Sequence, residues 1–141
     1  MTNLDLATSL LFKATKRLKV LDVLLAENDH SDVIRESQEI VELALKAMLR
    51  RAGVDPPRRH DVGATLREHA ARFSEDVRAD LERCAEISAL LVKEREQAFY
   101  GDIDFIPTEE YTREDSTRAM AEARFVVATA ARAASKETAG P

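Results

Sequence analysis

The residue in this sequence that is best placed to do chemistry is Arg95. It follows Leu91 by four positions and Val92 by three, and this spacing puts the three side chains on one face of a helix. A guanidinium on an apolar face is costly unless its charge is paired and its donors are satisfied. Three interpretations follow: the head group extends to solvent at the helix end, it pairs with a carboxylate such as Glu42 or Asp102, or it lines a pocket for an anion.

Glu42 and Lys46 are separated by four residues, with the acid first. On a helix this order typically forms a surface ion pair that contributes roughly 0.3–0.5 kcal/mol to stability. The alternative is a functional pair, in which Glu42 orients Arg95 and Lys46 offers a second positive charge. Spacing alone favours the surface pair and leaves the functional pair open.

The segment 46–60 is locally basic in an acidic chain, with arginines that are opposed mainly by Asp55. Cations near a helix C-terminus are favoured by the helix dipole, and the alternative is a patch for a phosphate or an RNA backbone. The three histidines, His30, His60 and His69, are scattered and have no cysteine beside them, so we predict no metal site. Because the sequence has no glycine-rich phosphate loop, we also predict no cofactor.

Five helices are expected to position these residues. Apolar residues recur at three- and four-residue steps, which is typical of amphipathic helices that share a core. The pattern predicts helices over residues 3–26, 32–52, 61–73, 74–100 and 112–134. The fold class is therefore all-α, an up-and-down bundle with the second and fourth helices at its centre.

Capping residues mark the ends of these helices. Gly53 stands where a left-handed C-cap is expected, and two prolines that follow it prevent continuation. Asp61 and Ser74 are the predicted N-caps of the third and fourth helices. Thr112 with Asp115 resembles a capping box, with Asp in place of the usual Glu.

The connection between the last two helices and the last helix itself have distinctive compositions. The connection is rich in rings and is expected to pack onto the bundle. Its aromatic residues are Phe99, Tyr100, Phe105 and Tyr111. The last helix presents small residues, which permit close approach of another helix. They are Ala119, Ala123, Val127, Ala130 and Ala134.

Length and composition limit the classes of protein. A chain of 141 residues, 45% of them hydrophobic, is expected to form one domain over residues 1–134, with a disordered tail at 135–141. The net charge of −5 provides no general basic excess for gripping duplex DNA. Cys84, the single cysteine, is expected to be an inert core residue. No apolar run approaches the roughly 20 residues that cross a bilayer and no signal-peptide pattern begins the chain, so we expect a cytoplasmic protein.

Taken together, the motifs resemble the HEPN domains (higher-eukaryote and prokaryote nucleotide-binding). Residues 36–49 are similar to the family's amphipathic "E-x-A-x-K-A-x-L" helix. The similarity continues through Gly53 to residues 57–61, which match its "P-x-x-H-[DN]" entry to the third helix. Arg95, the Tyr100-Gly101-Asp102 turn and the Ala-rich last helix complete the resemblance, which covers about residues 5 to 132.

The resemblance implies a homodimer. In many family members an Arg-x4-6-His motif at the end of the fourth helix forms a ribonuclease site across the dimer and cuts RNA without a metal. Arg95 matches the arginine of this motif, but Tyr100 occupies the place of the histidine. Phenols have a pKa of about 10 and are poor general bases at neutral pH. Shorter family members often accompany a minimal nucleotidyltransferase, which makes such a protein a candidate partner.

Three functions remain open at this stage. The first is a non-catalytic module that binds a nucleotide or RNA, with Arg95, Tyr100, Asp102, Glu42, Lys46 and His60 as the candidate ligand-binding residues. The second is a metal-independent ribonuclease of the toxin type, in which Arg95 acts with Tyr100 or His60. The third is a structural or interaction bundle without a ligand, in which Arg95 is only an ion pair.

Overall fold

The computed structural model describes residues 2–135, and the chain is helical in this range apart from its turns and the connections at residues 52–62 and 100–106. Four long helices form the bundle: α1 (Asn3–Ala26), α2 (His30–Arg51), α4 (Glu75–Phe99) and α6 (Arg113–Ser135). Shorter elements are α3 (Gly63–Glu68), a 3-10 turn (Ala70–Arg72) and α5 (Pro107–Glu110). The predicted all-α bundle is confirmed, with six α-helices rather than about five. The predicted tail lies outside the described residues, except for Ser135, which is helical.

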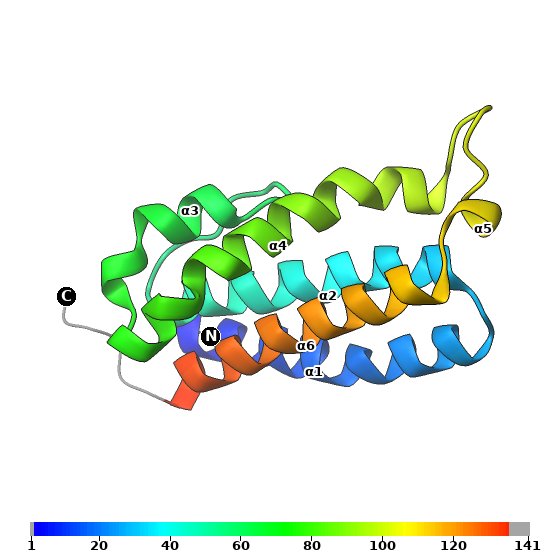
Figure 1. The fold of residues 1–141 in the computed structure, drawn as a ribbon. Helices are drawn as coiled ribbons and strands as arrows, with labels where there is room; N and C mark the ends of the chain where they lie inside the picture. The colour runs from blue at the N-terminus through cyan, green and yellow to red at the C-terminus, as the bar shows by residue number, and fades with distance from the viewer. Residues whose placement is uncertain (1, 136–141) are drawn as a thin grey trace.

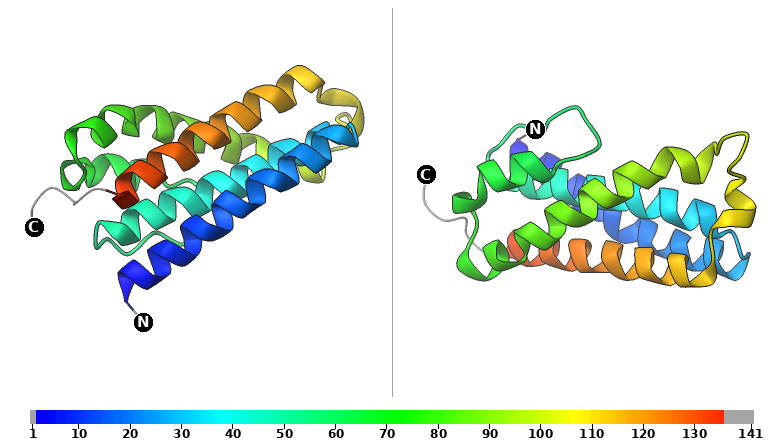
Figure 2. Two further views of the ribbon diagram at one scale, coloured as in Figure 1. Left: turned by 90° about the horizontal axis from the view of Figure 1, so that it is seen from below. Right: turned by 45° about the horizontal axis from the view of Figure 1, so that its top comes forward.

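α2 lies at the centre of the bundle, and α1, α4 and α6 pack around it (Figures 1 and 2). Apolar residues on several faces of α2 are fully buried, among them Ile34, Ile40, Leu45 and Leu49. α4 packs on α2, α3 and α6 and lies at one side, so the expectation that it shares the centre is wrong. α2 is buried on several faces, as expected of the central helix, because a central helix must contact all of its neighbours.

The helix ends follow the capping residues in part. Gly53 has φ +81° and confirms the left-handed C-cap, and the Thr112–Asp115 capping box is formed. α3 begins at Gly63 instead of Asp61, whose Oδ1 accepts from the Gly63 N–H at 3.0 Å. Ser74 precedes α4 as predicted, but its hydroxyl donates to Asp76 at 2.9 Å and makes no cap bond within the described chain.

The connection between α4 and α6 is only partly packed. Tyr111 lies against the core and its ring meets that of Phe105 edge-on, as the aromatic content predicted. Tyr100 is 73% exposed and Phe99 46%, so the prediction is wrong for these two rings. The reason is a sharp turn at Gly101 (φ +72°), which is followed by paired backbone hydrogen bonds between Asp102 and Phe105.

The small residues of α6 pack inside the bundle. Ala119, Ala123 and Ala130 are buried, and α6 packs on α2 and α1. Ala134 is exposed, and Ala133 is buried in its place. The small-residue face therefore serves this chain's own fold and lends no support to a dimer.

Two further sequence expectations concern the core and the membrane. Cys84 is buried, and burial raises the pKa of its thiol to about 11, which fits an inert core residue. Among residues 2–135, no helix combines the length and the apolar character that a membrane crossing requires.

Candidate functional site

A hollow of about 270 Å³ lies between α2 and the C-terminal turns of α4. Its lining combines cations, an acid and rings: Arg35, His60, Val92, Arg95, Glu96, Phe99 and Tyr100. Three of the predicted site residues, Arg95, Tyr100 and His60, therefore share one surface although they are far apart in sequence. Glu96 brings a negative charge to the same wall.

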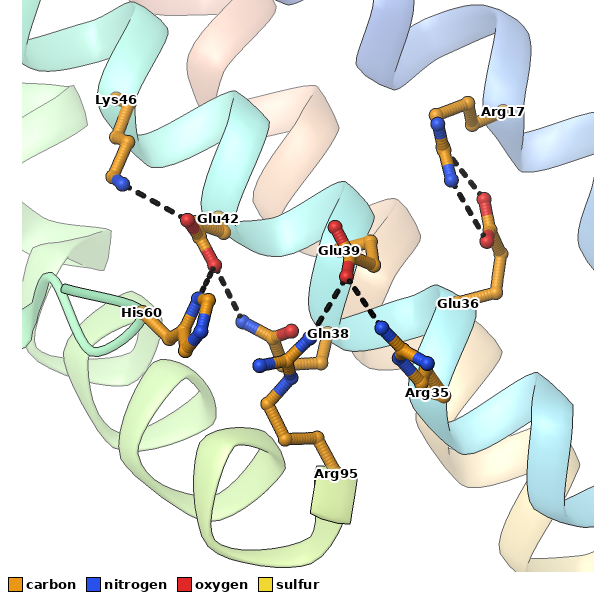
Figure 3. Close-up of polar contacts among 9 residues, drawn as sticks. All are labelled: Arg17, Arg35, Glu36, Gln38, Glu39, Glu42, Lys46, His60 and Arg95. Carbon is orange, nitrogen blue, oxygen red and sulfur yellow. Dashed lines mark hydrogen bonds and ion pairs between the residues drawn. The ribbon is translucent and has the colours of Figure 1, made fainter. Parts of the chain in front are cut away.

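Arg95 extends from α4 toward α2, where it meets Glu39 (Figure 3). Its Nη2 donates to Oε1 of Glu39 at 2.9 Å, and 18% of the side chain is exposed. Its Nε is buried and has no hydrogen-bond partner among the described residues. The ion-pair interpretation thus holds with Glu39 instead of Glu42 or Asp102, and the guanidinium also lines the hollow.

Glu39 is shared between two arginines. The Nη2 atom of Arg35, one turn earlier on α2, lies 3.5 Å from the same Oε1 that Arg95 contacts. The guanidinium of Arg35 also lies over the Phe99 ring, 4.0 Å from its centroid, which is a favourable cation–π geometry. Two guanidinium groups therefore converge on one carboxylate beside an aromatic ring.

Glu42 accepts three hydrogen bonds, and none comes from Arg95 within residues 2–135. The donors are Gln38 at 3.0 Å, Lys46 at 2.9 Å and His60 Nδ1 at 2.7 Å (Figure 3). Burial acts to raise the pKa of Glu42, but the hydrogen bonds together hold this pKa below its usual value. Glu42 and Lys46 thus form the predicted ion pair, and Glu42 orients His60 rather than Arg95.

Gln38 is a buried polar residue at the centre of this network. It is 1% exposed, and its amide nitrogen donates to Glu42. Its Oε1 has no hydrogen-bond partner in the described part of the chain. An unsatisfied buried acceptor is unusual and costs roughly 1–3 kcal/mol.

Tyr100 and Asp102 lie at the edge of this region. The Tyr100 ring stands edge-on to Phe99, with centroids 4.8 Å apart, and is open to solvent. Asp102 is exposed and its Oδ1 accepts from the Ile103 N–H at 2.7 Å. Asp102 is not a lining residue of the hollow, so the structure does not bring it together with the other candidates.

The basic segment 46–60 does not form one surface with the hollow. Arg50 pairs with Asp55 at 3.3 Å and donates to Asn3, and of the whole segment only His60 lines the hollow. Arg50 and Arg51 lie in the last turn of α2, where the helix dipole favours cations. The first interpretation therefore accounts for both. Within residues 2–135, no group of three or more His, Cys, Asp or Glu side chains is arranged to hold a metal.

Sequence reasoning missed the three residues of α2 that contact Arg95 or support its surroundings. Positions 35, 39, 42 and 46 follow one another by three or four residues, and position 38 stands three after 35 and four before 42. They therefore form a polar stripe on an otherwise apolar helix. Such a stripe, read together with an arginine on another apolar face, could have predicted that the two helices meet there. Its missed members are Arg35, Gln38 and Glu39.

Comparison with known proteins identifies a family that matches most of the chain. A family model described as HEPN domain matches residues 7–133. No curated protein and no solved structure matched the chain.

Proposed function

Because the chain belongs to the HEPN domain family, we propose that it is a non-catalytic module that binds a nucleotide or single-stranded RNA at the hollow beside Arg95. The observation that carries this function is the sharing of Glu39 by Arg35 and Arg95 at the wall of the hollow. Two guanidinium groups on one carboxylate keep N–H donors that Glu39 does not use, and these serve a second anion.

A phosphate group fits these donors. Guanidinium groups bind phosphate through paired, charge-assisted hydrogen bonds. Glu96 lines the same hollow, so its carboxylate repels an anion and limits the affinity. We therefore expect micromolar binding that weakens as the salt concentration rises.

The exposed Tyr100 ring favours a nucleobase next to the phosphate. Unpaired bases stack on aromatic side chains, and each such stack contributes about 1–3 kcal/mol. Tyr100 is 73% exposed at the edge of the hollow. Duplex DNA keeps its bases stacked inside the helix, so the preference is for nucleotides and single strands.

Two assembly partners follow from the family resemblance. One is a second copy of the chain in a homodimer, and the other is a minimal nucleotidyltransferase. Both would meet the protein in the cytoplasm, where nucleotides and RNA occur. A light-scattering mass of one subunit at micromolar concentration would contradict the homodimer. Failure of a minimal nucleotidyltransferase to co-purify with the chain in a native pull-down would contradict the second partner.

A thermal-melt panel of nucleotides and short RNAs tests this function on the wild type and on Arg95→Ala. A ligand at 100 times its Kd stabilises the folded state by about 2.7 kcal/mol, which shifts the Tm by several degrees. We expect a shift for the wild type that Arg95→Ala abolishes. No shift with any ligand would favour a structural or interaction bundle.

A metal-independent ribonuclease is the second candidate, and the position of His60 favours it. Its Nδ1 lies 2.7 Å from Glu42, which fixes the ring and leaves Nε2 for a substrate. His60 and Arg95 line the same hollow. An imidazole held by a carboxylate is the usual arrangement for a general base in nucleophilic catalysis.

In that reaction Nε2 of His60 takes the proton of a ribose 2′-hydroxyl. The 2′-oxygen bonds to the adjacent phosphorus, and the bond from phosphorus to the 5′-oxygen breaks. The 5′-oxygen takes a proton from the Tyr100 hydroxyl, while Arg95 stabilises the charge on the phosphate oxygens. The products are a 2′,3′-cyclic phosphate and a 5′-hydroxyl end.

Incubation of RNA with micromolar protein in chelator separates the two candidates. Cleavage that persists in His69→Gln and is lost in His60→Gln would establish the ribonuclease. Intact RNA after long incubation with the wild type would exclude it and leave binding as the function.

A further inference from the structure

A second hollow, of about 430 Å³, lies where the first turns of α1 meet the last turns of α2 and α6. Figure 2 shows these three helices side by side at the end of the bundle where α1 begins. The hollow shares no lining residue with the site beside Arg95. The two hollows are therefore separate features of the surface.

Small residues on α2 and α6 create this hollow. Ala47 projects from α2, and Ala130 and Ala134 from α6. An alanine side chain ends at its Cβ, so it leaves the space between the helices unfilled. Larger apolar side chains form the walls, including Leu4, Leu11, Phe12 and Met48.

The charged side chains that line this hollow are cations among the residues that the structure describes. Lys16 and Arg51 are among its lining residues, whereas no acidic side chain is among those that the structure describes. The Lys16 ammonium lies 5.3 Å from the centroid of the Phe12 ring, which places the charge beside the apolar wall.

Two hydroxyls add hydrogen-bond acceptors to the hollow. Thr8 and Thr15 both line the hollow and donate to backbone oxygens of α1 at 2.8 Å. Their oxygens keep lone pairs that can accept from a bound molecule. The cavity therefore combines a mainly apolar surface with a few polar groups, which is the usual composition of a small-molecule site.

We infer that this hollow binds an amphipathic monoanion, a hydrocarbon chain of medium length that ends in a carboxylate. The alanines leave room for the chain, which would cover the apolar surface of Leu4 and Phe12 that is now 49% and 61% exposed. Lys16 balances the carboxylate charge. The volume falls within the range of about 300–1,000 Å³ that is typical of small-ligand sites. A free molecule is favoured over a lipid in a bilayer, because the hollow is a groove between α1, α2 and α6 whose volume suits a single chain. Its α1 wall, with Leu4 and Phe12, is open to solvent.

Calorimetric titration with octanoate, decanoate and dodecanoate, each below its micelle concentration, tests this inference on the full chain. Burial of each added methylene should tighten binding roughly threefold to fourfold. Equal affinity for the three acids, or no binding of any, would overturn the inference. Binding to phosphatidylglycerol vesicles without binding to free acids would overturn it in favour of a membrane surface.

Matched variants locate the ligand. Ala134→Leu fills the hollow from an exposed position, and Ala131→Leu places the same side chain on α6 outside the lining. We expect Ala134→Leu to weaken dodecanoate binding at least tenfold and Ala131→Leu to leave it unchanged. Circular dichroism establishes that both variants are folded, and equal effects of the two would contradict the assignment.

The charge is tested in the same way. Lys16→Gln should weaken dodecanoate binding at least threefold, whereas Lys13→Gln, which removes a charge from α1 outside the hollow, should not. An unchanged affinity in Lys16→Gln would contradict the role of the ammonium. Since Arg95 is distant in sequence and lies in the other hollow, Arg95→Ala should bind dodecanoate like the wild type, whatever the outcome for nucleotides.

Discussion

The carboxylate of Glu39 on α2 holds the guanidinium of Arg95 on α4 through one contact of 2.9 Å. The Nε atom of that guanidinium stays buried and unpartnered within residues 2–135. A carboxylate that accepts bidentately from arginine would use two donors, so this pair is only half formed. The free protein thus keeps Arg95 oriented while leaving part of its hydrogen-bonding capacity unused.

Removal of the shared carboxylate should strengthen anion binding. In Glu39→Gln, Arg95 and Arg35 lose their common counter-charge, so we expect tighter binding of a nucleotide by threefold or more. The same change should lower the free energy of unfolding by about 1–2 kcal/mol, because a partly buried charge pair is broken. Titration and urea denaturation measure the two effects. Glu36→Gln, which breaks the Arg17 pair instead, is the control and should leave nucleotide affinity unchanged.

Loss of the Glu42 carboxylate should destabilise the protein in a pH-dependent way. Because its pKa is held below the usual 4.5, ionised Glu42 adds stability above that pH, and this contribution disappears as the pH falls through the folded-state pKa. Glu42→Gln should therefore cost about 1–3 kcal/mol at pH 7 and less at pH 4. Denaturation of both proteins at the two pH values checks this, and an equal difference at both would contradict it. Glu82→Gln, in an exposed pair with Arg67, should change little.

Asp32 should have the opposite pH dependence. Burial, with the neighbouring Asp29, raises the pKa of Asp32 from 3.8 to about 6. The folded state then favours the protonated form, so the stability from this group is complete below pH 3.8 and is lost as the pH rises through 6. We expect the Tm of Asp32→Asn minus the Tm of the wild type to increase as the pH rises from 4 to 7.5. Two parallel curves of Tm against pH would show that Asp32 has its ordinary acidity.

Gly101 is expected to tolerate no side chain. A Cβ added there would lie 2.4 Å from the Phe105 carbonyl oxygen and 2.5 Å from Cδ of Pro107, and its φ is +72°. Gly53 has a similar φ of +81°, but its nearest neighbour would be 3.9 Å away. In both alanine variants the strain of a side chain at positive φ should lower the free energy of unfolding by roughly 1–2 kcal/mol. Gly101→Ala should lose clearly more, because its Cβ also clashes with Phe105 and Pro107. Equal losses in denaturation would mean that the turn after Tyr100 adjusts freely.

Much of the fold could be predicted from the sequence because its signals are local. The apolar spacing of residues 3–26 gave the bounds of α1, and the capping box at Thr112 marked the start of α6. The start of α3 was misplaced because Asp61 caps the Gly63 N–H from two residues before the helix. Local sequence does not distinguish this turn from an N-cap.

The partners in the site could not be predicted in the same way. Arg95 was recognised by its place in an apolar stripe, but the choice of Glu39 over Glu42 depends on the rotation of α2 about its axis relative to α4. That rotation is set by the packing of many side chains. The exposure of Tyr100 likewise depends on the turn at Gly101 and on Phe105, which no pattern in the sequence relates to each other.

The binding of a labelled single-stranded RNA, followed by fluorescence anisotropy at one fixed salt concentration, tests the central claim most directly. We predict saturable binding by the wild type, a loss of at least tenfold in affinity for Arg95→Ala, and no more than a twofold change for Arg67→Ala, whose guanidinium pairs with Glu82 outside the hollow. A tenfold loss corresponds to about 1.4 kcal/mol. Equal affinities for the wild type and Arg95→Ala would contradict the account, as would the failure of the wild type to bind any RNA or nucleotide.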